Sequence, residues 1–210
     1  MSLDRDRGRG LAHSSGVNGN SARGFSFLEL VVVLAVIGVL LAVAVPRMGV
    51  FGRSDDARNL SNALSLAKMR AAANFTQARL YVSIGGRFQR VESWSKTAVP
   101  PNWVAVTGPG LLSNGVAFTS GPVATPPPNT QPAVAQAPPC LDKDGNVIAG
   151  TACIIFNSRG IPVDTTGTPT NNDALYVTDG TRIGAVTLSA AGLVTVWDGT
   201  FAANPVWARK

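Results

Sequence analysis

Hydrophobic and polar residues follow three different patterns along the chain. Residues 1–24 are polar, rich in Gly and Ser and without an apolar period, a composition typical of disordered segments. Residues 25–45, FSFLELVVVLAVIGVLLAVAV, are almost all apolar and hold one charge, Glu29. A helix rises about 1.5 Å per residue, so a run of this length spans about 30 Å, the thickness of a bilayer core. We therefore expect residues 25–45 to form a membrane-spanning helix.

The helical pattern continues beyond the apolar run, over residues 46–76. Pro46 lacks an N–H and predicts a kink or a local loosening of the helix. After it, apolar side chains recur at spacings of three and four and make one stripe, at Ala57, Leu60, Ala63, Leu64, Ala67 and Ala71. We expect one long, interrupted helix from residue 25 to about residue 74, whose amphipathic second half lies against a sheet.

From Gln77 onward the apolar period changes to two, which is typical of strands. The pair Gly85-Gly86 predicts a hairpin turn. Strands are expected at residues 78–84, 87–94, 103–107, 116–119, 151–156, 174–178, 182–188 and 193–197. Residues 121–139 hold seven of the fourteen prolines and no charge, which predicts a loop or an extended polyproline-like segment. The expected fold class is α+β, with the long N-terminal helix packed on an antiparallel β-sheet head formed by residues 77–210.

Composition narrows the classes of function. Hydrophobic residues make up 45% of the 210 residues and charged residues 14%, which excludes a highly charged disordered chain. Two cysteines are too few for a disulfide-dense miniprotein or a four-cysteine zinc site. His13 is the one histidine and Glu92 the one glutamate of residues 77–210, so no acid and base pair can be assigned. We expect no enzymatic activity, no cofactor and no metal site.

The distribution of charge predicts the orientation in the membrane. The formal net charge is +6, from 18 basic and 12 acidic residues. Residues 1–24 contribute +2, and the +4 of residues 25–210 is too mild to argue for nucleic acid by itself. Arginines before the apolar run place the leader in the cytoplasm and the head outside it. A cleaved signal peptide fits poorly, because Val45-Pro46-Arg47 is a poor cleavage site. A plain anchor fits the hydropathy but leaves Glu29 unexplained, since a lone carboxylate in lipid is costly.

The segment Gly24-Phe25-Ser26-Phe27-Leu28-Glu29 resembles the class III signal of type IV pilins and type II secretion pseudopilins. The resemblance implies that a prepilin peptidase removes residues 1–24 by cutting after Gly24, and N-methylates Phe25. Gly38 and Pro46 fall where this family has a helix-weakening glycine and a kinking proline. The implied fold is the type IV pilin-like fold, anchored once in the bacterial inner membrane with its head in the periplasm. The implied partners are other pilins or pseudopilins in a filament, the peptidase, the inner-membrane assembly platform and, before assembly, membrane lipid.

Glu29 has a physical role in this interpretation. Cleavage after Gly24 creates an ammonium group on Phe25, and Glu29 of a neighbouring subunit can neutralise it inside the apolar bundle. Each charge is costly alone and tolerable when paired. The pair would therefore favour docking at one axial register.

The head refines the resemblance. The segments Ile154–Gly160 and Ala185–Val196 are similar to the C-terminal half of GspH/FimT-type minor pseudopilins, and residues 67–73 resemble the end of that family's helix. The resemblance implies a minor component near the tip of a type II secretion pseudopilus, which acts in protein export. The alternative is a minor pilin of a type IV pilus, serving motility, adhesion or DNA uptake. The long leader and the proline-rich insert depart from the usual pattern.

Cys140 and Cys153 bracket a short loop, LDKDGNVIAGTA. In an oxidising periplasm two cysteines at this spacing can form a disulfide, which would contribute about 3 kcal/mol in the chain-entropy model; two free buried thiols are the alternative. Within the loop, Asp142-Lys143-Asp144-Gly145-Asn146 superficially resembles half of a calcium loop. The glycine comes too early and the distal glutamate is missing, so an Asp-Gly turn is the favoured interpretation.

Basic residues offer one further hypothesis, DNA capture by the head. A basic surface would contact phosphates with salt-sensitive affinity. The candidate contacts lie on or near the first hairpin and at the C-terminus: Arg79, Arg87, Arg90, Arg209 and Lys210. Ordinary solvated charge is the favoured interpretation of these residues. The tryptophans could stack on bases, but most are expected to pack in the core or at sheet edges.

Overall fold

The computed structural model describes the backbone of residues 26–170 and 172–210, and the side chains of these residues outside 41–53. Contacts divide the chain into two units, Met1–Ala44 and Val45–Lys210. The predicted leader 1–24, the cleavage site at Gly24 and the methylated Phe25 lie outside the described residues. The side chain of Pro46 also lies outside them, so its predicted kink stays a prediction.

The helix α1 spans Phe27–Ala73, close to the predicted range. It continues through Gly38, whose missing side chain faces open space. Ten strands follow it in the described residues: β1 Ala78–Ser83, β2 Phe88–Ser95, β3 Asn102–Ala105, β4 Gly110–Leu111, β5 Thr151–Phe156, β6 Pro162–Val163, β7 Asp173–Thr178, β8 Arg182–Leu188, β9 Val194–Thr200 and β10 Ala208–Arg209. The helical stem followed by antiparallel strands confirms the α+β prediction.

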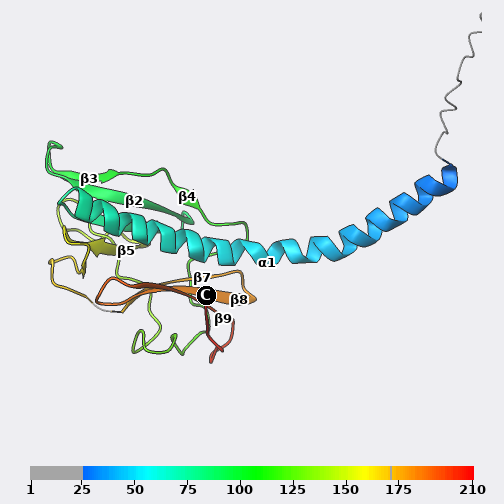
Figure 1. Cartoon of the computed structure of the whole chain (residues 1–210). Helices are drawn as coiled ribbons and strands as arrows, with labels where there is room; N and C mark the ends of the chain where they lie inside the picture. Colours follow the sequence, from blue (N-terminus) through cyan, green and yellow to red (C-terminus); the bar gives the residue numbers. More distant parts are fainter. Residues whose placement is uncertain (1–25, 171) are drawn as a thin grey trace, which may run out of the picture. The chain divides into compact units, whose positions relative to one another are not determined.

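The strands form two antiparallel sheets rather than the one sheet that the sequence predicted (Figure 1). The first sheet has the order β3-β2-β1-β5-β6, with β4 also paired to β2. The predicted hairpin joins β1 and β2, with Leu80 opposite Val91. The second sheet has the order β10-β9-β8-β7. The two-residue alternation identifies strands but not which of them share a sheet, because pairing is decided by non-local contacts.

The second half of α1 packs against both sheets. Its predicted stripe is buried except at Ala63, which is partly buried, and Leu60, Leu64, Ala67 and Ala71 are fully inaccessible. From the first sheet the same core receives Leu80, and from the second Leu175 and Val186. One helical stripe therefore joins the two sheets into a single core, and this burial supplies the main stabilisation of the head.

The proline-rich segment covers the outer face of the second sheet. Val123 and Val134 pack with Tyr176 in a smaller apolar cluster, and the Tyr176 hydroxyl donates to Gln131 Oε1 at 2.8 Å. The segment also protects the edge of β7, since the Ala137 N–H donates to the Ala174 carbonyl at 2.8 Å. As predicted, residues 121–139 contain no strand.

The predicted strand at residues 116–119 is wrong. Only one bridge forms there, between Ala117 and Thr178 at the edge of β7. Val116 and Phe118 are buried, so their alternation marked burial correctly. The segment pairs with the edge of β7 at this one position. Its other residues have no neighbouring strand to pair with, so no strand forms.

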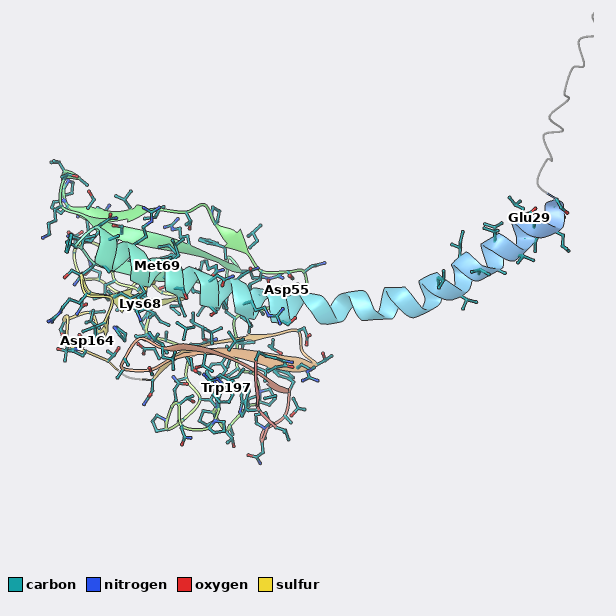
Figure 2. All side chains as sticks on the ribbon, viewed as in Figure 1. Glu29, Asp55, Lys68, Met69, Asp164 and Trp197 are labelled. Atoms are coloured by element: carbon teal, nitrogen blue, oxygen red, sulfur yellow. A yellow bond between two sulfur atoms is a disulfide. The ribbon has the colours of Figure 1, made fainter. Side chains whose placement is uncertain are left out.

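Lys68 fixes the turn at Gly192 to the side of α1, and Figure 2 labels it on the helix. Its ammonium donates to the Gly192 carbonyl at 3.0 Å. A side chain at Gly192 would place Cβ 3.0 Å from Lys68 Nζ and 3.2 Å from the Gly160 carbonyl oxygen. Gly192 also has φ +73°, a conformation that other residues adopt at a cost. The turn therefore needs glycine both for its backbone and for the close approach.

We predict that Gly192→Ala destabilises the head by about 2 kcal/mol, the sum of a left-handed backbone cost and a steric one. Gly145→Ala is the matched control, because Gly145 has φ +85° and open space around it; it should cost about 1 kcal/mol. Thermal unfolding of the full chain in mild detergent, followed by circular dichroism, measures both. An equal loss of stability in the two variants would mean that the close approach of Lys68 to Gly192 does not contribute to the cost of the substitution.

Candidate functional site: an apolar helix and a charged head

The first turns of α1 expose apolar side chains in every direction. Between Leu30 and Leu40, the large apolar residues are 45–65% exposed, and Phe27 and Leu28 are still more exposed. A helix that is apolar all round is normally buried. This part of the chain therefore requires cover by lipid or by other protein.

Glu29 is the one charged side chain among the described residues of this apolar stretch, and Figure 2 labels it near the start of α1. An acidic residue in the first turn is favoured by the helix dipole. Its carboxylate is exposed and has no ion pair within the described residues. Glu29 can therefore receive a cation from outside the described structure.

Among the residues that the structure describes, no helix is long and apolar enough to cross a membrane. The predicted span 25–45 reaches beyond this part at both ends, since Phe25 and the side chains of residues 41–45 lie outside it.

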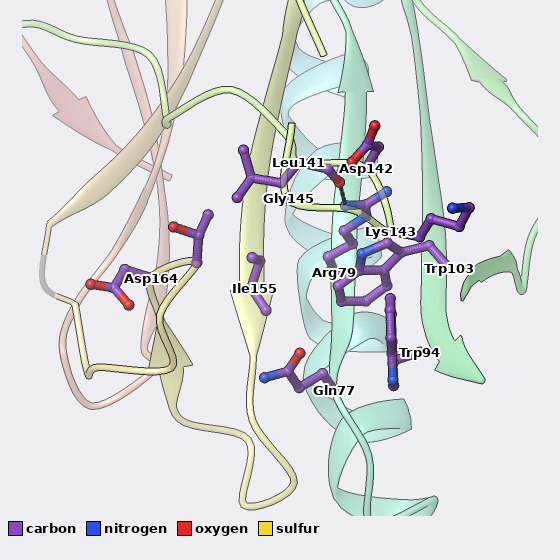
Figure 3. Close-up of a pocket in the computed structure, with 11 residues that line it drawn as sticks. Gln77, Arg79, Trp94, Trp103, Leu141, Asp142, Lys143, Gly145, Ile155 and Asp164 are labelled. Atoms are coloured by element: carbon purple, nitrogen blue, oxygen red, sulfur yellow. Dashed lines mark hydrogen bonds between the residues drawn. The ribbon is translucent and has the colours of Figure 1, made fainter. Parts of the chain in front are cut away.

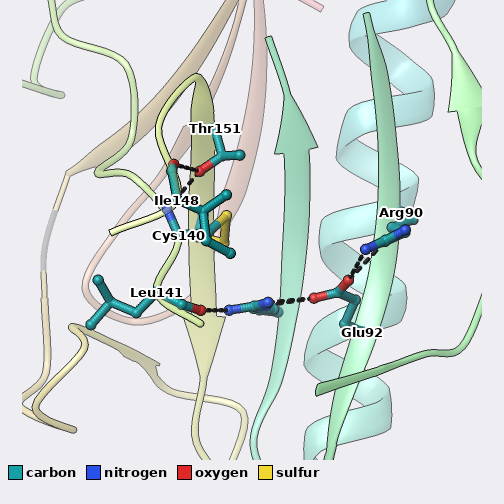
Figure 4. Close-up of a disulfide and its surroundings, with 8 residues drawn as sticks. Arg90, Glu92, Cys140, Leu141, Ile148 and Thr151 are labelled. Carbon is teal, nitrogen blue, oxygen red and sulfur yellow. Dashed lines mark hydrogen bonds and ion pairs between the residues drawn. A yellow bond between two sulfur atoms is a disulfide. The ribbon is translucent and has the colours of Figure 1, made fainter. Parts of the chain in front are cut away.

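Three charges of the head are bound to one another around Glu92 (Figure 4). Its buried carboxylate accepts from Arg79 Nε at 2.7 Å and from Arg90 Nε at 2.7 Å. Arg79 also donates to the Leu141 carbonyl at 2.6 Å, and its guanidinium lies 4.1 Å from the centre of the Trp103 ring. Burial lowers the pKa of Arg79, while the charge of Glu92 opposes this shift. The network joins β1 and β2 to the loop after Cys140.

The structure separates the basic residues predicted as DNA contacts. Arg79 is 3% exposed, so it has almost no surface to offer a phosphate, and we drop it as a candidate contact. Arg87 donates to the carbonyls of Val116 and Ser113, where it holds a loop. Arg90 is half-buried beside Glu92, and Lys210 lies 3.8 Å from Asp198. DNA contact by these residues and by the exposed Arg209 stays a prediction.

The predicted disulfide is present, between Cys140 and Cys153 (Figure 4). It attaches the end of the proline-rich segment to β5, where the Cys153 N–H also donates to the Pro138 carbonyl at 2.7 Å. Inside the loop, Asp142 Oδ1 accepts the backbone N–H groups of Asp144 and Asn146 at 2.8 Å. These bonds, first among them that from Asn146, lower the pKa of Asp142. The segment is thus a carboxylate-capped turn, and within the described residues no group of three or more metal-ligating side chains gathers.

Asp56 is a buried carboxylate on α1. Its two oxygens accept the backbone N–H and the hydroxyl of Ser113, at 3.0 and 3.1 Å. Burial raises the pKa of Asp56 despite these two donors. Its position beside the apolar Ala57 gave no sign of burial, because the partner lies 57 residues away.

Comparison with known proteins adds two similarities. Residues 19–45 match the family described as the prokaryotic N-terminal methylation motif, which confirms the predicted prepilin-type signal. The structure of the minor pseudopilin EpsH from the type 2 secretion system of Vibrio cholerae is similar to this chain, with a TM-score of 0.33 and 11% identity, over 76% of this chain and 96% of that chain. A search of curated proteins gave no significant match.

We predict that Glu92→Gln destabilises the head by about 3–5 kcal/mol, because it leaves Arg79 buried without its anion. Arg90→Met removes the more exposed partner of the same carboxylate and should cost less than about 1 kcal/mol. Chemical unfolding of the full chain in detergent measures both. Similar losses for the two variants would show that burial of Arg79 does not set the strength of the network.

We predict that Asp56 makes the stability of the head fall as pH rises. Because its folded pKa lies above the unfolded value, the folded state binds more protons between the two values, and stability decreases with rising pH in that window. The variant Asp56→Asn should flatten this slope. Ser113→Ala should cost more at pH 7 than at pH 4, because it removes a donor to the carboxylate. Unfolding curves at both pH values test this, and parallel profiles for all three proteins would contradict it.

Proposed function

We propose that this chain is a structural subunit of a pilin-like filament, specifically a minor pseudopilin of a type II secretion pseudopilus. The observation that carries the proposal is the start of α1. It lies within a prepilin-type methylation motif, exposes apolar side chains in every direction and holds one carboxylate, Glu29. Such a surface needs an apolar environment with one available cation.

Processing would supply that cation. In the proposed pathway the prepilin peptidase cuts after Gly24 and methylates Phe25, which leaves a positive charge at the new N-terminus. Membrane lipid covers residues 25–45 before assembly, with the head in the periplasm. In the filament the same surface is covered by neighbouring pilins, and Glu29 pairs with the N-terminus of one of them. Pairing removes most of the cost that either charge has alone in an apolar bundle.

The choice of a secretion pseudopilus rests on the head. The strand β5 with its following turn, and the hairpin of β8 and β9, are the segments that resemble GspH/FimT-type subunits. A position near the tip, contact with the inner-membrane assembly platform and a role in protein export belong to this proposal. A minor pilin of a type IV pilus would share the same processing and the same head.

We propose a structural and not an enzymatic role. The one glutamate of the head, Glu92, is bound by two arginines. The one histidine of the chain is His13, within the proposed leader. These residues leave no assigned acid and base in the head.

Glu29 provides the test of assembly. We predict that Glu29→Gln is cleaved and inserted into the membrane like the wild type. Its amount in filaments should fall about tenfold or more, because the N-terminal cation of the neighbouring subunit loses its partner. Asp55→Asn, which removes a half-exposed carboxylate farther along α1, is the control and should assemble normally. Gel mobility reports cleavage, and cross-linking in a sheared filament fraction reports assembly. Normal incorporation of Glu29→Gln would refute the pairing.

A second experiment, in a strain that lacks this chain, tests whether the filament is a secretion pseudopilus or a type IV pilus. Retention of exoproteins in the periplasm, with unchanged synthesis, is expected for a secretion pseudopilus. Unchanged secretion would contradict that assignment and favour the type IV pilus.

A further inference from the structure

The end of α1 has an unusual backbone. Four described residues other than glycine have positive φ: Phe75, Arg87, Asn129 and Asn172. Asparagine tolerates this conformation, and the guanidinium of Arg87 is held by two carbonyls. Phe75, with φ 49°, lacks such an explanation. A bulky side chain in the left-handed region is strained, and glycine is the usual residue there.

Hydrogen bonds fix Phe75 in this conformation. The Thr76 N–H donates to the Ala71 carbonyl at 3.2 Å, and the Phe75 N–H to the Ala72 carbonyl at 3.5 Å. This is the Schellman arrangement that ends a helix. The Thr76 hydroxyl then donates to the Trp94 carbonyl on β2 at 2.9 Å. The backbone is determined by these bonds, and glycine would satisfy them without strain.

The phenyl ring of Phe75 gains little from the fold, because it is 82% exposed. A strained backbone that carries an exposed aromatic side chain lowers stability without a packing benefit inside the described structure. Strain of this kind is characteristic of binding sites. The benefit of the ring must then come from a partner.

The surroundings of Phe75 are hollowed. Two hollows of about 350 and 310 Å³ flank it, and both are also lined by Thr76, Trp94 and Lys96. A third hollow of about 190 Å³ adjoins them through Trp94 and holds Trp103 and Arg79 on its wall (Figure 3). We call this surface, defined by Phe75, Trp94 and Lys96, the Trp94 groove. Exposed aromatic residues beside a polar rim are typical of interface hot spots.

Charge distinguishes the two hollows beside Phe75. Lys96 is their one charged lining residue, and within the described residues it has no ion pair. The third hollow has four charged lining residues, and each has a partner of its own. Arg79 pairs with Glu92 and Lys143 with Asp144, while Asp142 and Asp164 accept hydrogen bonds within their own turns. The available charge of the groove is therefore one cation next to two aromatic rings.

We propose that the Trp94 groove binds an acidic, apolar segment of another protein. One carboxylate of that segment pairs with Lys96, and a neighbouring apolar side chain packs against Phe75 and Trp94. A single-stranded nucleic acid would also stack on the rings, but it requires a track of several cations for its phosphates, and these hollows supply one. The inference concerns the head alone and does not depend on the assembly proposed above.

The test uses the full chain in detergent and fluorescent peptides of about twelve residues. One peptide repeats Asp with Leu and Phe, a second has Lys in place of Asp, and a third has Ser in place of Leu and Phe. Only the first should bind the wild type. Phe75→Gly and Lys96→Glu should each weaken this binding about tenfold or more.

Stability separates binding from folding in this test. Phe75→Gly should raise the midpoint of thermal unfolding by about 2–4 °C while it loses the peptide, because it relieves backbone strain. Val206→Ala, which shortens another highly exposed apolar side chain, and Arg209→Glu, which reverses an exposed cation on β10, should bind as the wild type. Equal binding of the acidic and basic peptides, unchanged binding by Phe75→Gly, or preference for a thymidine oligonucleotide would overturn the proposal.

Discussion

The head depends on the burial of one stripe of α1 against two sheets. Leu60, Leu64 and Ala67 have no accessible surface, and their contacts come from strands that do not pair with each other. Neither sheet could cover its inner face without the helix, because an apolar sheet face must be buried against another layer. Lys68, beside the same stripe, then fixes the turn at Gly192. A small alanine at position 67 or 71 also lets the sheets approach the helix closely.

One helix thus has two different surfaces along its length. From residue 54 onward it buries one stripe within its own chain, whereas between Phe27 and Leu40 it buries no large apolar side chain among those described. The first pattern is that of a helix in a folded domain, and the second is that of a helix whose partners are other molecules. The core of the head is therefore formed by residues from Ala57 onward, without the apolar side chains between Phe27 and Leu40.

Local sequence patterns predicted the helix and most strands, whereas non-local contacts decided how the strands pair and which charged residues are buried. The helical stripe and the hairpin at Gly85-Gly86 followed from spacing and turn chemistry, and the disulfide from spacing together with the expected oxidising periplasm. The second sheet could not be predicted, since alternation in β7 and β8 says nothing about which strands they join. Arg79 looked like a surface charge for the same reason, because the Leu141 carbonyl that covers it is 62 residues away. Nothing in the sequence singles out Phe75, whose unusual feature is its positive φ angle in the folded chain.

The charges that remain available after folding indicate where this chain meets other molecules. In the head, Arg79, Arg90 and Glu92 neutralise one another, and Lys68 is occupied by a turn. Glu29 and Lys96 have no ion pair within the described residues, and each lies among exposed apolar or aromatic side chains. A partner that covers such a charge removes water from it, and this loss of hydration is offset only when the partner supplies an opposite charge. Because the two residues have opposite sign, the partner proposed for Glu29 brings a cation and the partner proposed for Lys96 an anion. The two proposed sites therefore require partners of opposite charge.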